Sequence, residues 1–199
     1  MKVAVIRYNA GNIHSVTCAL TRLGADWVVT DDRKTIMEAD RVIFPGVGEA
    51  SSAMSYIRAN GLDGIIASLR APFLGICLGM QLMCASSEEG NTECLSVFDG
   101  RTVLFPKDRG YKIPHMGWNS ISALSSPLFR GIEEDSYVYF VHSFYVPSSP
   151  CTIAKCSYDG IDFSAALSKD NYFGVQFHPE KSGRVGERIL SNFLGDGIC

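Results

Sequence analysis

The sequence has little that would suit binding to a nucleic acid, a membrane or a metal ion. Its 18 basic and 21 acidic residues give a formal net charge of −3, and its one basic cluster, Lys107, Arg109 and Lys112, lies in a stretch typical of a solvated loop. No hydrophobic run reaches the length of a membrane span. The seven cysteines include no C-x-x-C pair and no Cys/His spacing of a zinc site. We therefore expect no nucleic-acid, membrane or metal partner.

The cysteine spacing also gives no disulfide framework, and reduced thiols are typical of the cytoplasm, where we expect this chain to act. The opening residues 1–6 hold an apolar run too short for a signal peptide, so they predict a first strand. A chain of 199 residues that is 46% hydrophobic can bury a substantial core, and no repeat or linker divides it. We expect a single domain over residues 1–199.

The first half of the sequence alternates between strand and helix signals. Short apolar runs predict strands, and apolar residues at helical spacing predict helices. In chain order these are the strand at 3–6, the helix over 16–23, the strands at 27–29 and 42–44, the helices around 54–57 and 65–69, and the strand at 73–76. This alternation predicts an α/β fold: a mostly parallel central sheet with helices on both faces and ligands beyond the carboxyl ends of its strands.

The second half is rich in strand signals and has little helical periodicity. Its predicted strands are 137–141, 152–158, 163–167 and 172–177. His115 falls in a loop beside proline, and the last helix is predicted to have Ser182 as its N-cap and to end at Gly195. We expect these strands to form an antiparallel β extension of the sheet.

A cysteine between two glycines follows the strand at 73–76, in Gly75-Ile76-Cys77-Leu78-Gly79. In a G-x-nucleophile-x-G elbow the nucleophile occupies a strained turn, and the glycines let the following helix pack closely on the strand. Such a turn puts Cys77 at a helix N-terminus, which favours a thiolate and offers backbone N–H groups to an oxyanion. The alternative is a buried cysteine beside packing glycines, the commoner use of the residue.

Two further segments can complete a site around this elbow. Gln81 lies one helical turn after Cys77 on the same face, so its amide can point at a bound substrate, although a surface or capping glutamine is the alternative. The loop at 45–48 ends the third strand, where its proline and glycines are expected to prevent ordinary pairing and to leave N–H groups free. Gly46 and Val47 can then add a second N–H to the oxyanion hole.

A cysteine nucleophile needs an imidazole to take its proton and a third group to orient that imidazole. His178 ends an apolar strand and is followed by Pro179 and Glu180. Because proline stops strand pairing, His178 and Glu180 should leave the sheet together, at the kind of edge where Cys77 is also predicted. Alone, this pattern also suits a strand-ending turn with a surface carboxylate. Together with the elbow it predicts a Cys-His-Glu triad.

These residues make the chain resemble the class I glutamine amidotransferases, which carry a G-x-C-x-G elbow and a later His-x-Glu. More narrowly, the chain is similar to the glutaminase subunits of imidazole glycerol phosphate synthases. The matching segments are 8–12, 45–48, 75–81, 114–119, 139–143 and 176–182. The resemblance therefore covers nearly the whole chain and extends the fold prediction to a class I glutamine amidotransferase-like fold.

The resemblance implies that Cys77 attacks the side-chain amide of L-glutamine, that His178 protonates the leaving ammonia, and that Glu180 orients His178. Water then hydrolyses the glutamyl thioester. The residues implied to bind the substrate are Gln81, Glu89, Ser143 and Phe144, and those implied to supply oxyanion N–H groups are Gly46, Val47 and Leu78. The resemblance implies no cofactor.

Released ammonia needs an acceptor, and the sequence has neither a second domain nor a nucleotide-binding fingerprint. The resemblance implies a heterodimer with the cyclase subunit of imidazole glycerol phosphate synthase, which uses ammonia to make imidazole glycerol phosphate and an aminoimidazole carboxamide ribotide in histidine biosynthesis. The residues that match positions near this interface are Asn12, Trp118, Tyr139 and Lys181. A glutaminase that serves anthranilate or pyridoxal phosphate synthesis, or a non-catalytic binding module, are the alternatives.

Overall fold

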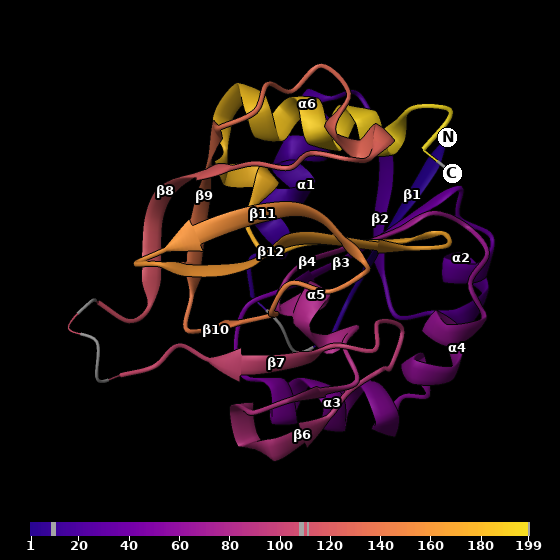
Figure 1. The fold of residues 1–199 in the computed structure, drawn as a ribbon. Helices are drawn as coiled ribbons and strands as arrows, with labels where there is room; N and C mark the ends of the chain where they lie inside the picture. Colours follow the sequence, from indigo (N-terminus) through magenta and orange to yellow (C-terminus); the bar gives the residue numbers. More distant parts are fainter. Residues whose placement is uncertain (9–10, 108–109, 111, 199) are drawn as a thin grey trace.

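The structure is a computed structural model that describes residues 1–8, 11–107, 110 and 112–198. Asn9 and Ala10 of the segment at 8–12, and Arg109 of the basic cluster, lie outside the described residues. Seven described strands form the central sheet (Figure 1). In order across the sheet they are β11 (Thr152–Tyr158), β12 (Ile161–Lys169), β13 (Tyr172–Val175), β4 (Phe73–Cys77), β3 (Arg41–Gly46), β1 (Lys2–Ile6) and β2 (Asp26–Thr30).

The sheet is parallel from β2 to β13, and β12 and β11 continue it as antiparallel strands. This confirms the predicted mostly parallel sheet with an antiparallel extension. The order brings β3 and β13 to the two sides of β4, so that Gly46 pairs with Cys77 and Val175 pairs with Ile76. The carboxyl ends of these three strands therefore meet at one edge of the sheet, as expected for a parallel sheet that binds a ligand.

Alternate residues of β1 face two different hydrophobic layers. Val3 and Val5 belong to the layer that includes α1 (Ile13–Arg22) and α6 (Gly183–Leu194). Ala4 and Ile6 belong to the other, with α2 (Arg33–Met37), α3 (Ala50–Ala59) and α4 (Leu62–Ser68). Figure 1 shows α1 and α6 above the sheet and α3 and α4 below it. Helices thus cover both faces, as predicted, and none in the described part of the chain could cross a membrane.

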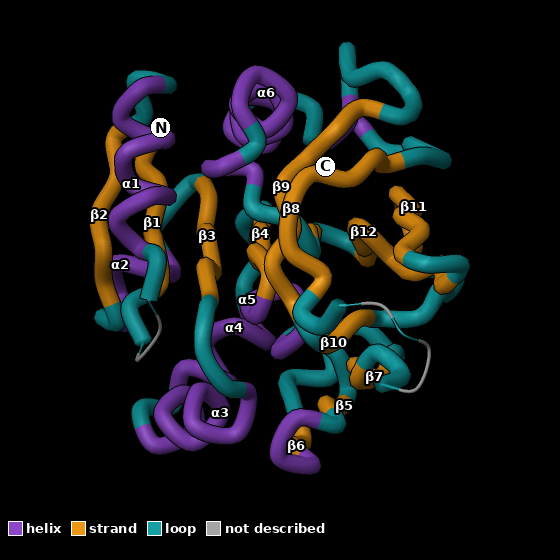
Figure 2. Tube along the Cα trace, turned by 90° about the vertical axis from the view of Figure 1, so that its left-hand side faces the viewer, coloured by secondary structure: helices purple, strands orange, loops and turns teal. Residues whose placement is uncertain are grey.

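Two smaller sheets flank the central one. β8 (His115–Ile121) and β9 (Ser136–His142) form an antiparallel pair on the side that faces the viewer in Figure 2. The second small sheet contains β10 (Phe144–Tyr145), β7 (Arg101–Leu104), β5 (Ser86–Ser87) and β6 (Thr92–Glu93). The remaining elements are α5 (Leu78–Leu82) and the 3-10 helices η1 (Glu89–Asn91), η2 (Pro127–Phe129) and η3 (Pro179–Lys181).

Two predictions about local structure were wrong. His115 was expected in a loop but begins β8. Pro114 lies just before this strand, where its lack of a backbone N–H removes no hydrogen bond from the ladder with β9. The loop at 45–48 was expected to prevent strand pairing, yet β3 runs through Pro45 to Gly46 and pairs with β4. The ladder between β1 and β3 ends at Ile43, so the proline has a neighbouring strand on one side only.

The close packing of α5 on the sheet gives a prediction for Gly79. A Cβ atom at this position would overlap the carbonyl oxygen of Phe44, which belongs to backbone and cannot turn away. We expect Gly79→Ala to lower the free energy of unfolding by about 3 kcal/mol or more, as measured by urea denaturation. Gly64→Ala is the matched control, because a Cβ on Gly64 meets nothing within 4 Å and alanine favours the helix that holds it. Equal unfolding midpoints for the two variants would contradict this prediction.

Candidate active site

Cys77 occupies a strained turn between β4 and α5. Its backbone has φ 53° and ψ −109°, a conformation that non-glycine residues rarely adopt. Both flanking glycines are needed for space, since a Cβ on Gly75 would lie 2.8 Å from the backbone nitrogen of Met80 and one on Gly79 would overlap Phe44. The strand, turn and helix predicted for this segment are therefore confirmed, and the geometry is that of a nucleophile elbow.

His178 lies beyond the end of β13, next to the strand that carries Cys77. Its backbone N–H donates to the carbonyl of Tyr139 at 2.9 Å, and its ring Nδ1 lies 2.8 Å from Oε1 of Glu180. The His178 and Glu180 side chains are almost fully buried. His178 Nε2 has no hydrogen-bond partner among the described residues. A ring held at Nδ1 leaves Nε2 available for a proton that moves to or from a neighbouring group.

The electrostatic surroundings of His178 favour its protonated form. Burial alone lowers the pKa of this histidine, but the negative charges of Cys77 and Glu180, together with the hydrogen bond from the ring to Glu180, outweigh burial and raise the pKa to about 10. The sulfur, the imidazole and the carboxylate predicted from distant parts of the sequence thus act on one another in the fold.

Asn12 and Ser182 occupy the N-cap positions of α1 and α6, but neither side chain caps its helix. Asn12 Nδ2 donates to Oε1 of Glu180 and lies 3.4 Å from His178 Nδ1. Ser182 Oγ donates to the carbonyl of His178 at 2.7 Å and accepts the N–H of Tyr139 at 2.9 Å. The capping role predicted for the Ser182 side chain was wrong, because its hydroxyl is hydrogen-bonded to the His178 carbonyl and the Tyr139 N–H instead. Both residues instead fix His178 and Glu180.

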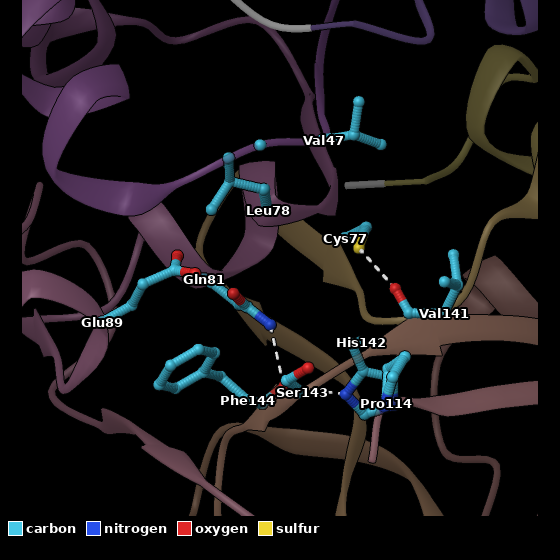
Figure 3. Close-up of a pocket in the computed structure, with 11 residues that line it drawn as sticks. Val47, Cys77, Leu78, Gln81, Glu89, Pro114, Val141, His142, Ser143 and Phe144 are labelled. Carbon is cyan, nitrogen blue, oxygen red and sulfur yellow. Dashed lines mark hydrogen bonds between the residues drawn. The ribbon is translucent and has the colours of Figure 1, made fainter.

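A cavity of about 310 Å³ opens beside Cys77 (Figure 3). The predicted site residues that line it are Val47, Leu78, Gln81, Glu89, Ser143 and Phe144. The sulfur of Cys77 points toward the carbonyl of Val141 at 3.8 Å, on the wall opposite Gln81. A volume of this size suits a small ligand such as an amino acid.

The amide of Gln81 is held by the protein. Its Nε2 donates to the carbonyl of Phe144 and to Oε1 of Gln176, each at 2.9 Å. Both of its N–H groups therefore have protein acceptors, and a ligand in the cavity would meet its oxygen.

Glu89 joins the cavity to the start of α3. Its Oε2 accepts the backbone N–H of Ala50 at 2.8 Å. Burial raises the pKa of the Glu89 carboxyl, and this hydrogen bond opposes the shift. Glu89 is the predicted residue that brings an acidic group to the cavity wall.

Gly46 and Val47 end β3 beside the elbow. A Cβ on Gly46 would lie 2.9 Å from both the Gly79 nitrogen and the Leu78 Cβ, so only glycine allows this approach. Val47 and Leu78 both line the cavity. The structure therefore places the three predicted oxyanion residues next to Cys77: Gly46 pairs with it in the ladder, and Val47 and Leu78 line the same cavity.

Trp118 and Tyr139 lie on the small sheet formed by β8 and β9. Their rings meet edge to face with centroids 6.1 Å apart. Trp118 is 56% exposed, and its neighbours Met116 and Tyr137 are 65% and 60% exposed. Lys181 is exposed beside Glu180 in η3. Exposed apolar side chains in such a group are typical of an interaction surface.

Comparison with known proteins agrees with this site. Residues 4–196 match the family model of class I glutamine amidotransferases. The chain is 58% identical to the imidazole glycerol phosphate synthase subunit HisH of Bacteroides fragilis, over 98% of this chain and 99% of that protein. It is 46% identical to the HisH subunit of Pasteurella multocida, over 96% of each chain. The chain belongs to the HisH family of class I glutamine amidotransferases.

Solved structures share the fold of this HisH-family chain at low identity. A glutamine amidotransferase has a TM-score of 0.73 at 14% identity, with 96% of both chains covered. PurLQS from Thermotoga maritima has a TM-score of 0.68 at 16% identity, with 97% of both chains covered. Within the described residues, no group of three or more His, Cys, Asp or Glu side chains could hold a metal ion.

Two residues near the elbow of this HisH-family chain were missed by sequence reasoning. Gln176 Nε2 lies 3.7 Å from the sulfur of Cys77, and the available sequence signal was a polar residue inside the otherwise apolar run at 174–177. The Tyr8 hydroxyl is buried without a partner among the described residues, and a Cβ on Gly46 would clash with it. Burial raises the pKa of Tyr8 well above its usual range, so this hydroxyl keeps its proton. A tyrosine at the end of a strand gives no signal in the sequence that its hydroxyl is buried beside the elbow.

Proposed function

We propose that this chain is the glutaminase subunit of an imidazole glycerol phosphate synthase and acts in histidine biosynthesis in the cytoplasm. It hydrolyses L-glutamine to glutamate and ammonia, and a cyclase subunit in the same heterodimer uses the ammonia. The observation that carries this proposal is the buried pair of His178 and Glu180 beside the strained Cys77, in a chain 58% identical to a HisH subunit. The six described cysteines all have free thiols, which suits the cytoplasm.

In the proposed reaction the sulfur of Cys77 attacks the carboxamide carbon of glutamine. The negative charge on the oxygen is stabilised by N–H groups of Leu78 and of the Gly46–Val47 segment. The imidazolium of His178 protonates the departing ammonia, which leaves a glutamyl thioester on Cys77. His178 then takes a proton from water, the water attacks the thioester, and glutamate leaves.

The proposed binding mode follows from the charges at the two ends of the substrate. The carboxylate of Glu89 pairs with the α-ammonium group of glutamine, because the two carry opposite charges within one cavity. The backbone of Ser143 and Phe144 holds the α-carboxylate on the opposite wall. Gln81 supports that wall through its hydrogen bond to the Phe144 carbonyl.

The proposed docking surface for the cyclase comprises Asn12, Trp118, Tyr139 and Lys181. Exposed rings on β8 and β9 support this assignment. The backbone of Tyr139 is hydrogen-bonded on one side to His178 and on the other to Ser182. A partner seated on this sheet would therefore act close to the catalytic histidine.

The decisive test mixes the chain with a purified imidazole glycerol phosphate synthase cyclase subunit, glutamine and the ribulose-phosphate substrate of the cyclase. We expect glutamate and imidazole glycerol phosphate in equal amounts. Ammonium salt in place of glutamine is the control, since it should supply the cyclase without this chain. Failure to form glutamate would overturn the proposal, and glutamate release that only an anthranilate or pyridoxal phosphate synthase stimulates would favour the alternative partner.

We further expect low glutaminase activity from the chain alone. The second oxyanion donor belongs to the Gly46–Val47 segment. Val47 already lines the cavity, but Gly46 is held in the ladder between β3 and β4, so we infer that partner binding reorients the backbone N–H of this segment. Loss of one oxyanion donor costs roughly 100-fold to 1000-fold in rate, and we expect the lone chain to be slower by about that factor. Glutamate release measured with and without the cyclase checks this, and equal rates would contradict it.

A further inference from the structure

Two histidines outside the proposed triad form a buried pair. His115 begins β8 and His142 ends β9, directly opposite each other in the ladder between these strands. Nδ1 of His115 lies 2.9 Å from Nε2 of His142, and the two residues are only 3% and 6% exposed. The proposed reaction uses neither of them. Polar pairs buried to this extent usually serve a specific purpose or are fixed by further partners.

The hydrogen bonds around the pair determine where each proton lies. The Phe144 carbonyl can only accept, so His142 Nδ1, which lies 2.7 Å from it, carries a proton. Burial lowers the pKa of His142 to about 3 and that of His115 to about 4, so both rings are neutral at physiological pH. His142 Nε2 is then an acceptor, and His115 Nδ1 must donate to it.

Asn119 completes the chain of hydrogen bonds at its other end. The Asn119 amide nitrogen lies 3.3 Å from His115 Nε2 and donates to the carbonyl of Ser157 at 2.9 Å. A neutral His115 that donates through Nδ1 has a bare Nε2, which accepts from this amide. One consistent direction of donation thus runs from Asn119 through both histidines to the Phe144 carbonyl.

The end point of this chain lies on the cavity wall. The Phe144 carbonyl accepts from His142 Nδ1 at 2.7 Å and from Gln81 Nε2 at 2.9 Å, so two donors fix the same oxygen. Figure 3 shows both side chains converging on the Ser143–Phe144 backbone. Two bonds on one carbonyl fix the plane of the following peptide and restrain the adjoining backbone, which the proposed function assigns to the substrate carboxylate.

We propose that His142, with its donor role set by His115, is a positioning residue that fixes the Ser143–Phe144 backbone to receive the amino-acid end of the substrate. This inference rests on the proposed function, because it concerns binding of the same substrate. It assigns His142 no contact with the reacting atoms. Loss of its bond to Phe144 should therefore weaken recognition of the amino-acid end and leave the reactivity of Cys77 intact.

A purely structural role is the competing explanation, since both rings are surrounded by aromatic side chains. His142 lies 5.4 Å from Phe105 and 5.3 Å from Phe163, measured between ring centroids. A side chain that only fills this aromatic cluster would be replaced about equally well by asparagine or by glutamine. The two explanations therefore differ in what they predict for this pair of polar substitutions.

The test compares His142→Asn with His142→Gln in the complex with the cyclase. The asparagine amide nitrogen can occupy the place of Nδ1 and donate to Phe144, whereas the glutamine amide reaches the place of Nε2 and can pair only with His115. Because the Gln81 donor remains on the Phe144 carbonyl, His142→Gln removes one of two hydrogen bonds, and we expect it to raise KM for glutamine by a factor of roughly 3 to 10. His142→Asn should recover most of the wild-type KM.

Covalent labelling of Cys77 by two reagents supplies a second test. If His142 had only a structural role, its substitution would slow both reagents equally. Iodoacetamide has no amino-acid end, whereas a glutamine-like chloroketone needs one to be recognised. We expect His142→Gln to slow labelling by the chloroketone. Labelling by iodoacetamide should stay within about twofold of wild type, because this reagent does not use the backbone that His142 positions. Equal KM values for the two variants, or equal slowing of both reagents, would overturn the inference.

Two further outcomes keep the test decisive. If His142→Gln does not fold, His115→Asn and His115→Gln form the second pair, because only asparagine preserves the donor that faces His142. We then expect a higher KM for His115→Gln alone, and equal values would overturn the inference. A wild-type complex that releases no glutamate would instead overturn the proposed function, and this inference with it.

Discussion

Replacing Cys77 with alanine should abolish glutamate formation, with a fall in kcat on the order of 10⁴-fold or more, since Cys77 carries the one thiol among the described residues that line the cavity. The fold should persist. Alanine at position 77 must adopt the same φ of 53° that cysteine adopts, and only one buried sulfur atom is lost. The measurements are steady-state glutamate release in the presence of the cyclase, thermal unfolding, and the affinity for the cyclase.

Cys84→Ala is the matched control for this prediction. Cys84 is fully buried, and burial raises its pKa to about 12, so its thiol is not a nucleophile at neutral pH. We expect this variant to keep wild-type kcat. The expected residual turnover of Cys77→Ala is about 0.01% of wild type. More than about 1% would exceed it by two orders of magnitude and would show that Cys77 is not the nucleophile.

The elements that the sequence predicted best are those whose surroundings dictate their composition. A strand covered on both faces must be apolar throughout, and β4 is buried at all five of its residues. The spacing of Ile189, Leu190 and Phe193 predicted α6 because these residues lie on the buried face of the helix, while its opposite face is exposed to water. The antiparallel strand β11 was predicted at 152–158, which are its observed bounds.

The elements that sequence reasoning missed depend on partners that are distant in the chain. β8 pairs with β9 across a connection that includes η2, and the short strands β5 and β6 exist only through their ladders with neighbours. Local propensity carries little information about such pairings. The position of Pro45 in β3 likewise depends on where the ladder with β1 ends, which the residues around Pro45 do not reveal.

The candidate site divides in the same way. The elbow and the His-Pro-Glu segment are local patterns, so the sequence predicted Cys77, His178 and Glu180. The contact of Asn12 with Glu180 joins residues 168 positions apart, and the contact of Gln176 with Cys77 joins residues 99 apart. Supporting residues of this kind are recognised only when the fold brings the segments together.

Replacing Glu180 with glutamine should lower kcat by roughly 10³-fold to 10⁴-fold, because an uncharged amide no longer orients His178 or stabilises its imidazolium. Oε1 of Glu180 accepts from both His178 and Asn12, so the substitution disturbs two hydrogen bonds in a buried site. Glutamate release in the presence of the cyclase measures the loss. Glu187→Gln is the matched control, since Glu187 forms an exposed ion pair with Arg22 on α1 and should leave kcat unchanged.

The same substitution should change how stability depends on pH. The pKa of His178 is about 10 in the folded protein against an ordinary value of 6.5, with Glu180 among the groups that raise it. A group whose folded pKa is raised stabilises the fold fully below the unfolded pKa and loses that contribution as the pH rises through the folded pKa. The difference in free energy of unfolding between wild type and Glu180→Gln should therefore be greatest near pH 6.5 and should shrink toward pH 10. Urea denaturation at several pH values checks this, and a difference that grows with pH would mean that Glu180 does not stabilise the imidazolium.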